Sequence, residues 1–370
     1  MVVIDALDEC DNKDGVCQIL DVLLSHATQL PVKFFVTSRP EPRILDKMEH
    51  GPERSTPVGL YLHDIERSLV SADIRTYLKD RLTGFSNDNL EILVQRSGVL
   101  FIYAATVALY IGGGTLARRT ARLKLVLAGS ITPMQNNEDK MNDLYDSILR
   151  AAFDDGDLGD FEKDEMRRVL HTVLCAQEPL AEGVIASLLG LNRDSVKAAL
   201  EPLLSVLHLS KRTGVVTTLH KSFPDYMFNK ARSRRFHCEA REHHRLLAKQ
   251  CFYLVGTHRL PFNICNLESS YVFDKDVLKL DQRVETAISA TTFYACRFWG
   301  PHLVNTGPSP DLVIALHDFL SVRLLLWMEI MNLKQCMSAG VGVLHDIQTW
   351  LQVGGYVTRM LLAHSRSIGG

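Results

Sequence analysis

The chain has 370 residues, of which 46% are hydrophobic and 23% charged, and its formal net charge is −2. This composition excludes disorder, collagen and a long coiled coil as its main character. At about 150 residues per domain it indicates two to three globular domains. The near-neutral charge gives no overall attraction to nucleic acid or anionic lipid. The eight cysteines are scattered without C-x-x-C pairs, which predicts reduced thiols in a cytosolic or nuclear protein, and we expect a cytoplasmic location.

The start of the chain predicts a β-α-β unit. The apolar run Met1–Ile4 indicates a strand that ends in Asp5, and the spacing of apolar residues over Val16–Ala27 predicts a helix. A second strand, Val32–Thr37, then runs directly into Arg39 and its neighbours. Strands joined by such a crossover are parallel neighbours, so the polar residues at their carboxyl ends are expected to meet at one edge of the sheet.

The acids at this edge could serve nucleotide chemistry. Asp5 could hold a Mg²⁺ ion through water, and Asp8 or Glu9 could orient or deprotonate a water that faces a γ-phosphate. The guanidinium of Arg39 could reach the same phosphate. The alternative is that the three acids only cap the loop and helix that follow.

Several segments resemble the NACHT proteins, within the STAND class of P-loop NTPases. Val2–Cys10 is similar to their Walker B segment, and Phe34–Pro40 to their sensor strand. Ser97–Thr106 resembles the lid helix of the fungal NACHT group. Four later segments are also similar to that fungal group: His244–Phe252, Phe262–Tyr271, Tyr294–Leu303 and Phe319–Glu329.

One element of that family has no counterpart in the sequence. A P-loop NTPase binds phosphates with G-x-x-x-x-G-K-[ST], and this chain contains no Gly-Lys pair. The resemblance implies that the loop lies upstream of the Walker B strand, so we expect a truncated NACHT module or, alternatively, a natural pseudo-NTPase. Mg²⁺ with ATP or ADP, and hydrolysis, are expected of a full-length parent, whereas this chain alone is expected to bind no nucleotide.

The resemblance and the periodicity together predict a mainly α fold with a short α/β start and four regions. These are the remnant of the NTPase core (1–58), a helical lid (59–137), a winged helix (138–236) and a helical extension (237–370). Residues 97–117 carry no charge, but their continuous apolar part, Val99–Ile111, is too short for a membrane span and predicts a buried helix. We therefore expect no membrane partner. The acids that follow the first strand also argue against a secretory leader.

The third region has the element order of a winged helix. Helices are predicted around Met166–Leu174, Leu180–Leu189 and Arg193–Leu204, followed by a hairpin whose turn is Lys211–Gly214. Such a domain could bind DNA. The third helix nevertheless carries acids and lacks the Asn, Gln or Arg face that reads bases, so nucleic acid is an unlikely partner.

Leu219–Tyr226 resembles the STAND element that presents a histidine to the β-phosphate of bound ADP. The resemblance implies that His220 binds the nucleotide and locks the resting state. Lys221 departs from the pattern, because this position is often acidic in related plant and animal proteins. The alternative is a histidine packed at a strand end.

Charge is distributed unevenly along the second half of the chain. Residues 138–165 contain eleven acids and three bases, whereas residues 207–250 contain ten bases and three acids. The basic cluster is expected to form a solvated helix face that meets the acidic loop or another domain. Its members are Arg232, Arg234, Arg235, Arg241, Arg245 and Lys249, with His237, His243 and His244.

Zinc is a weaker alternative for the same segment. Cys238, His243, His244 and Cys251 are near one another in sequence, but one helix cannot turn all four inward. The last third is predicted to be helical over Leu246–Val255, Lys279–Trp299, Asp311–Asn332 and Val343–His364, with Trp299, Trp327 and Trp350 in the core.

Three functional hypotheses follow, in descending order. The first is a regulatory module of a STAND signalling NTPase, the second a non-catalytic interaction scaffold, and the third a winged-helix regulator that binds nucleic acid. The partners expected are other protein domains, namely the missing part of the NACHT module and downstream repeats, with possible self-assembly.

Overall fold

The computed structural model describes residues 1–10, 12–26, 29–49, 65–128, 136–257, 262–269 and 271–353. It divides into two compact units, Met1–Leu69 and Val70–Gly370, and each is described on its own. The fold is mainly α with a short α/β start, as the sequence predicts. The predicted boundary between residues 58 and 59 lies outside the described residues.

The first unit contains the predicted β-α-β arrangement. Strands β1 (Val2–Ile4) and β2 (Phe34–Val36) are parallel, with Val3 opposite Phe35, and helix α1 (Lys13–His26) connects them. β2 is shorter than the predicted strand 32–37. A 3-10 turn, η1 (Leu7–Glu9), follows β1, and helix α2 (Pro42–Glu49), which the sequence did not predict, follows β2.

The first unit has a very small core. Its buried apolar side chains are Leu7, Val16, Leu20 and Ile44. Val3 and Phe35 are 56% and 57% exposed although they lie on paired strands.

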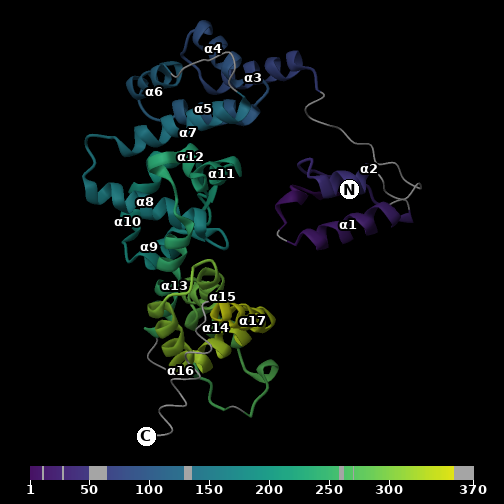
Figure 1. Ribbon diagram of the computed structural model, residues 1–370, viewed down its shortest axis with the longest axis vertical. Coiled ribbons are helices and arrows are strands. Elements are labelled where there is room, and N and C mark those ends of the chain that lie inside the picture. The colour runs from purple at the N-terminus through teal and green to yellow at the C-terminus, as the bar shows by residue number, and fades with distance from the viewer. Residues whose placement is uncertain are drawn as a thin grey trace. The chain divides into compact units, whose positions relative to one another are not determined.

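The second unit begins with a bundle of helices (Figure 1). In chain order these are α3 (Arg67–Arg81), α4 (Asn87–Ser97), α5 (Phe101–Gly112), α6 (Leu116–Ala128) and α7 (Asn137–Phe153). α5 packs against α4, α6 and α7, which confirms the predicted buried helix, although Phe101 and Leu109 remain about half exposed. Among the described helices, none is both long and apolar enough to cross a membrane.

Three helices and a small sheet follow the bundle (Figure 1). They are α8 (Asp160–Cys175), α9 (Glu182–Leu189) and α10 (Arg193–Leu200), with strands β3 (Leu180–Ala181), β4 (Leu207–Leu209) and β5 (Val215–Thr218). The strands pair antiparallel in the order β3-β5-β4. The third helix ends at Leu200, before the predicted Leu204, because Pro202 lacks the N–H that a continuing helix needs and starts a 3-10 turn instead.

Two short helices, α11 (Ser222–Phe228) and α12 (Lys230–Ser233), lead to the C-terminal helices (Figure 1). The latter are α13 (Ala240–Gly256), α14 (Leu280–Ala287), α15 (Ala290–Val304), α16 (Pro310–Leu333) and α17 (Met337–Val353). The single helix predicted over Lys279–Trp299 is wrong. The chain is extended at Ile288, and the Ser289 hydroxyl accepts the backbone N–H of Thr292, so a new helix starts there.

One continuous core joins the second unit from Ile74 to Trp350. Trp299, Trp327 and Trp350 are buried, as predicted. The indole N–H of Trp327 donates to the Cys296 carbonyl (2.8 Å), and that of Trp350 donates to the Thr306 carbonyl (3.0 Å). The polar atom of each indole is therefore satisfied inside the core. Residues 354–364 of the last predicted helix lie outside the described residues.

Candidate functional site

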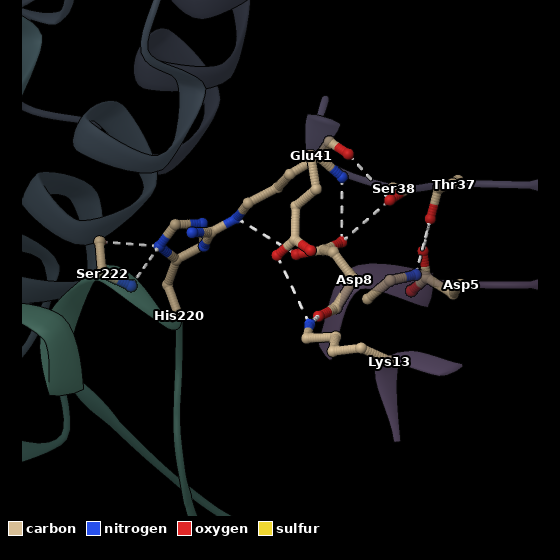
Figure 2. A network of polar contacts seen from close by, with 10 residues as sticks. Asp5, Asp8, Lys13, Thr37, Ser38, Glu41, His220 and Ser222 are labelled. Carbon is tan, nitrogen blue, oxygen red and sulfur yellow. Dashed lines mark hydrogen bonds and ion pairs between the residues drawn. The ribbon is translucent and has the colours of Figure 1, made fainter. Parts of the chain in front are cut away.

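Asp5 lies at the carboxyl end of β1 and is held by Thr37, at the end of β2 (Figure 2). The Thr37 hydroxyl donates to Asp5 Oδ1 and accepts the backbone N–H of Ala6 (2.9 Å). The Thr37 backbone continues the ladder, because its N–H donates to the Ile4 carbonyl (2.9 Å) and its carbonyl accepts the N–H of Leu7 (2.9 Å). Thr37 therefore orients the carboxylate that the sequence singled out.

A left-handed residue turns the chain between Asp5 and Asp8. Ala6 has φ 51° and ψ 51°, a conformation that an L-residue with a Cβ adopts at a cost of order 1–3 kcal/mol. The turn lets Leu7 enter the small core of the first unit and brings the buried Asp8 beneath the end of β2. The strain thus occurs where the predicted site residues are placed.

Asp8 is 2% exposed and interacts with the residues that follow β2 (Figure 2). Its Oδ1 accepts the backbone N–H of Arg39 (2.9 Å) and lies 3.5 Å from the Ser38 hydroxyl. Its Oδ2 lies 3.6 Å from Nε of Arg39. A carboxylate this deeply buried needs such partners, because an isolated charge is costly to remove from water. Asp8 therefore serves here as the anchor of Arg39.

Glu9 and Lys13 are placed differently. Glu9 is exposed at the end of η1. The Lys13 ammonium donates to the Asp8 carbonyl and lies 3.5 Å from Glu41 Oε1 (Figure 2). Lys13 is thus engaged with protein acceptors.

The donors at this edge can be compared with what a nucleotide site needs. Asp5 and Thr37 offer hard oxygen donors of the kind that Mg²⁺ accepts. Within the described residues, however, no group of three or more His, Cys, Asp or Glu could hold a metal ion. The sequence also lacks the Gly-Lys loop that would bind phosphates. The roles of Asp5, Asp8, Glu9 and Arg39 in nucleotide chemistry therefore stay predictions.

His220 belongs to the second unit and lies between β5 and α11. Its Nδ1 is 2.7 Å from the Ser222 hydroxyl and accepts the Ser222 backbone N–H (3.2 Å), as Figure 2 shows. The Ser222 hydroxyl is also 2.8 Å from the hydroxyl of Tyr145, on α7. Strand β5 and helices α7 and α11 thus combine to orient the ring.

Sequence reasoning therefore found some of the polar residues and missed others. It named Asp5, Asp8 and Arg39, which the structure brings to one edge of the two-stranded sheet. The missed residues are Thr37, Ser38, Lys13, Ser222 and Tyr145. Thr37 and Ser38 could have been found from their place at the end of the second strand, whereas no local pattern points to Tyr145.

The acidic and basic stretches meet, as the sequence predicts. Arg232 contacts Glu138 (2.6 Å), and its guanidinium also donates to Asn142. Arg235 contacts Asp154. Much of the acidic stretch is not a loop, however, because residues 137–153 form helix α7 with an amphipathic pattern that buries Tyr145. The basic cluster therefore faces a helix as well as a loop.

The residues considered for zinc point to different partners. Cys238 Sγ lies 3.8 Å from Cys175 Sγ, and His243 Nε2 lies 2.9 Å from the Thr172 hydroxyl. His244 contacts His302 on α15 through their Nδ1 atoms (2.9 Å). Burial, the main cause, lowers the pKa of His243 and of His302 to about 3, so both imidazoles are neutral at pH 7. These residues are core side chains.

Comparisons with known proteins found a family model and a similar protein. The family model described as "Nephrocystin 3, N-terminal" matches residues 1–39. The vegetative incompatibility protein HET-E-1 of Podospora anserina, a fungal NACHT/WD-repeat protein, is 21% identical over 376 aligned positions, which cover 95% of this chain. The chain is thus similar to a fungal NACHT-type protein over nearly all of its length. It spans about a quarter of the length of HET-E-1, at 26%. No solved structure matches.

Proposed function

We propose that the chain is the regulatory part of a nucleotide-dependent switch of the STAND class. The observation that carries the proposal is the extent of the relationship to HET-E-1, which covers 95% of the chain and is not confined to the first strands. The similarity therefore extends into the later helices, well beyond the first 39 residues that the family model matches. In such a switch, nucleotide exchange would move domains and expose surfaces for assembly.

The first unit supports this role through the edge where its two parallel strands end. Asp5 would face Mg²⁺, and Arg39, anchored on Asp8, would face a phosphate. The phosphate loop would come from a preceding segment of a longer protein. This arrangement would explain why the acids are held in place at the strand ends although the sequence contains no Gly-Lys phosphate-binding loop.

Residues 138–236 would form a winged helix that carries the nucleotide sensor. The three helices and the sheet β3-β5-β4 support this assignment, and His220, at the end of β5, would donate to the β-phosphate of ADP. Its partners would be other protein domains and further copies of the same protein. All eight cysteines are unpaired, which supports a reducing compartment, the cytoplasm.

The genomic sequence upstream of Met1 provides the first test. We expect an open reading frame that contains G-x-x-x-x-G-K-[ST]. In the protein encoded by that frame, calorimetry should detect ADP binding that weakens about tenfold in His220→Gln, the loss expected for one charge-assisted hydrogen bond. His317→Gln, a change at an exposed histidine of α16, is the matched control.

The second candidate is a non-catalytic interaction scaffold. The observation that favours it is the lack of a Gly-Lys pair in the sequence. A genuine start codon at Met1, with no upstream frame, would select this candidate. For the chain as given we expect no measurable ATP binding, and micromolar Mg²⁺-dependent binding would contradict both readings.

A further inference from the structure

The contacts of His220 determine which of its ring nitrogens carries the proton. The backbone N–H of Ser222 donates to Nδ1 at 3.2 Å, and an atom that accepts a backbone N–H has its lone pair exposed and no proton. In the neutral imidazole the proton is therefore on Nε2. The structure thus selects one of the two tautomers.

The same argument sets the direction of the other two hydrogen bonds. Since Nδ1 has no proton to offer, the Ser222 hydroxyl is the donor over the 2.7 Å to His220. A serine hydroxyl has one proton, so it must accept from Tyr145 over the remaining 2.8 Å. The Tyr145 hydroxyl therefore donates to Ser222, and the Ser222 hydroxyl donates to His220. In a chain of this kind each hydrogen bond strengthens the other.

Tyr145, the first donor in this chain of hydrogen bonds, is held in place by packing. It is 1% exposed, and its ring lies against Phe223 (centroids 5.1 Å apart) and Tyr226 (5.4 Å), both on α11. Burial, the main cause, raises the pKa of Tyr145 to about 12, so the hydroxyl keeps its proton at neutral pH. The donor is therefore present whenever α7 and α11 are packed together.

The backbone around His220 is also fixed. The N–H of Leu219 donates to the Val206 carbonyl (3.0 Å), and the N–H of Phe223 donates to the His220 carbonyl (3.1 Å). The ring thus has an anchored main chain on either side. Ser222 and Tyr145 act on the rotation of the side chain, which the main-chain hydrogen bonds leave open.

We propose that Ser222 and Tyr145 are positioning residues that hold His220 as its Nε2–H tautomer, so that the ring presents an N–H donor to an anionic oxygen acceptor. The inference rests on the proposed function only for the identity of that acceptor, a phosphate oxygen. It also assigns a route of regulation. A movement that separates α7 from α11 removes the Tyr145 hydroxyl and weakens the orientation of the donor.

The test uses the full chain with ¹³C,¹⁵N-labelled histidine, because ring nitrogen and carbon shifts distinguish the tautomers by NMR. Loss of one of the 14 histidine signals in His220→Gln assigns the resonance. At a pH where the ring is neutral we expect the Nε2–H form to dominate. Ser222→Ala should lower the ratio of the two tautomers roughly fivefold, the factor for a net hydrogen bond of about 1 kcal/mol.

Two further variants separate positioning from packing. Tyr145→Phe keeps the ring contacts and should lower the ratio about twofold. Tyr226→Phe removes a buried hydroxyl from the neighbouring ring. That hydroxyl has no hydrogen-bond partner among the residues that the structure describes, so the change should leave the ratio unchanged. Ser222→Thr keeps a hydroxyl and should restore the ratio to the wild-type value, which guards against misfolding of the alanine variant.

Two outcomes would overturn the proposal as a whole, and a third would remove Tyr145 from it. They are a proton on Nδ1 in the wild-type chain, or equal ratios in the wild type, Ser222→Ala and Tyr145→Phe. An equal loss in Tyr226→Phe and Tyr145→Phe would likewise reject a specific role for Tyr145. Because no nucleotide is needed, the result is independent of the proposed switch. If the tautomer responds as expected but His220→Gln leaves ADP binding unchanged, the proposed function fails and the positioning role stands.

Discussion

The two units obtain their order in different ways. Among its described residues, the first has four buried apolar side chains and exposed residues on both strands, so its polar network at the strand ends is a large part of what defines its structure. The second has one continuous core that runs through all its helical layers. The acids for which the sequence predicts nucleotide chemistry therefore lie in the unit that has the smaller described core and is less able to fold alone.

Separating the units should have the largest effect. A chain that begins at Glu66 should unfold with a free energy within about 1 kcal/mol of the corresponding transition in the full chain, because it keeps nearly all the core. A peptide of residues 1–65 should show little helix by circular dichroism. Cooperative unfolding of that peptide would show that the core of the first unit is large enough for it to fold alone, which would contradict the difference proposed between the two units.

Trp327→Ala should be the most damaging single change in the second unit. The side chain is 2% exposed and its indole packs against Trp299 (centroids 5.8 Å apart), so we expect a loss of about 3–5 kcal/mol in the free energy of unfolding measured with urea. Leu325→Ala, on the same helix but 64% exposed, is the control and should change it by less than about 0.5 kcal/mol. Similar losses in both variants would mean that α16 is covered on both faces.

Acid should destabilise the second unit through its buried histidines. Burial lowers the folded-state pKa of His302 to about 3, against about 6.5 when unfolded. The unfolded chain therefore binds more protons below pH 6.5, so this contribution to stability is complete above pH 6.5 and is lost as the pH falls towards 3. The loss should reach up to about 2 kcal/mol at pH 5, as measured by urea unfolding between pH 7 and 5.

The control for this prediction is another histidine of the second unit. His302→Gln should flatten the dependence of stability on pH, whereas His317→Gln, at a side chain that is 57% exposed, should leave it as in the wild type. Tyr294 and His244 contact the His302 ring, so a glutamine there keeps polar partners. An unchanged pH dependence in His302→Gln would show that His302 does not cause it.

The smallest effect is expected at the paired charges. Arg235 and Asp154 are each about half exposed, and such pairs contribute about 0–1 kcal/mol. Arg235→Gln should therefore lower the free energy of unfolding by less than about 1 kcal/mol, and the difference should shrink at 1 M salt. Arg212→Gln in the exposed turn between β4 and β5 serves as the control. A loss that is large and independent of salt would point to packing by the Arg235 side chain.

Helices and strands with a strong local sequence pattern could be predicted, but their first and last residues could be predicted less well. The two parallel strands, the buried helix α5 and the three core tryptophans followed from apolar runs and helical spacing. The break in the helix predicted over Lys279–Trp299 could not be predicted in this way, because apolar residues continue across the break. Helix α7 was also missed, since its acids obscured the apolar stripe that contains Tyr145.

By itself the sequence determined which residues are apolar enough to be buried and which polar residues follow the first two strands. It placed Asp5, Asp8 and Arg39 at one edge because the carboxyl ends of parallel strands lie at the same edge of a sheet. Only the tertiary structure decided that Thr37 orients Asp5, and that Tyr145 meets Ser222 from 77 positions away. The reason is physical: periodicity reports whether one side chain is buried, whereas a hydrogen bond between distant residues depends on how separate elements pack.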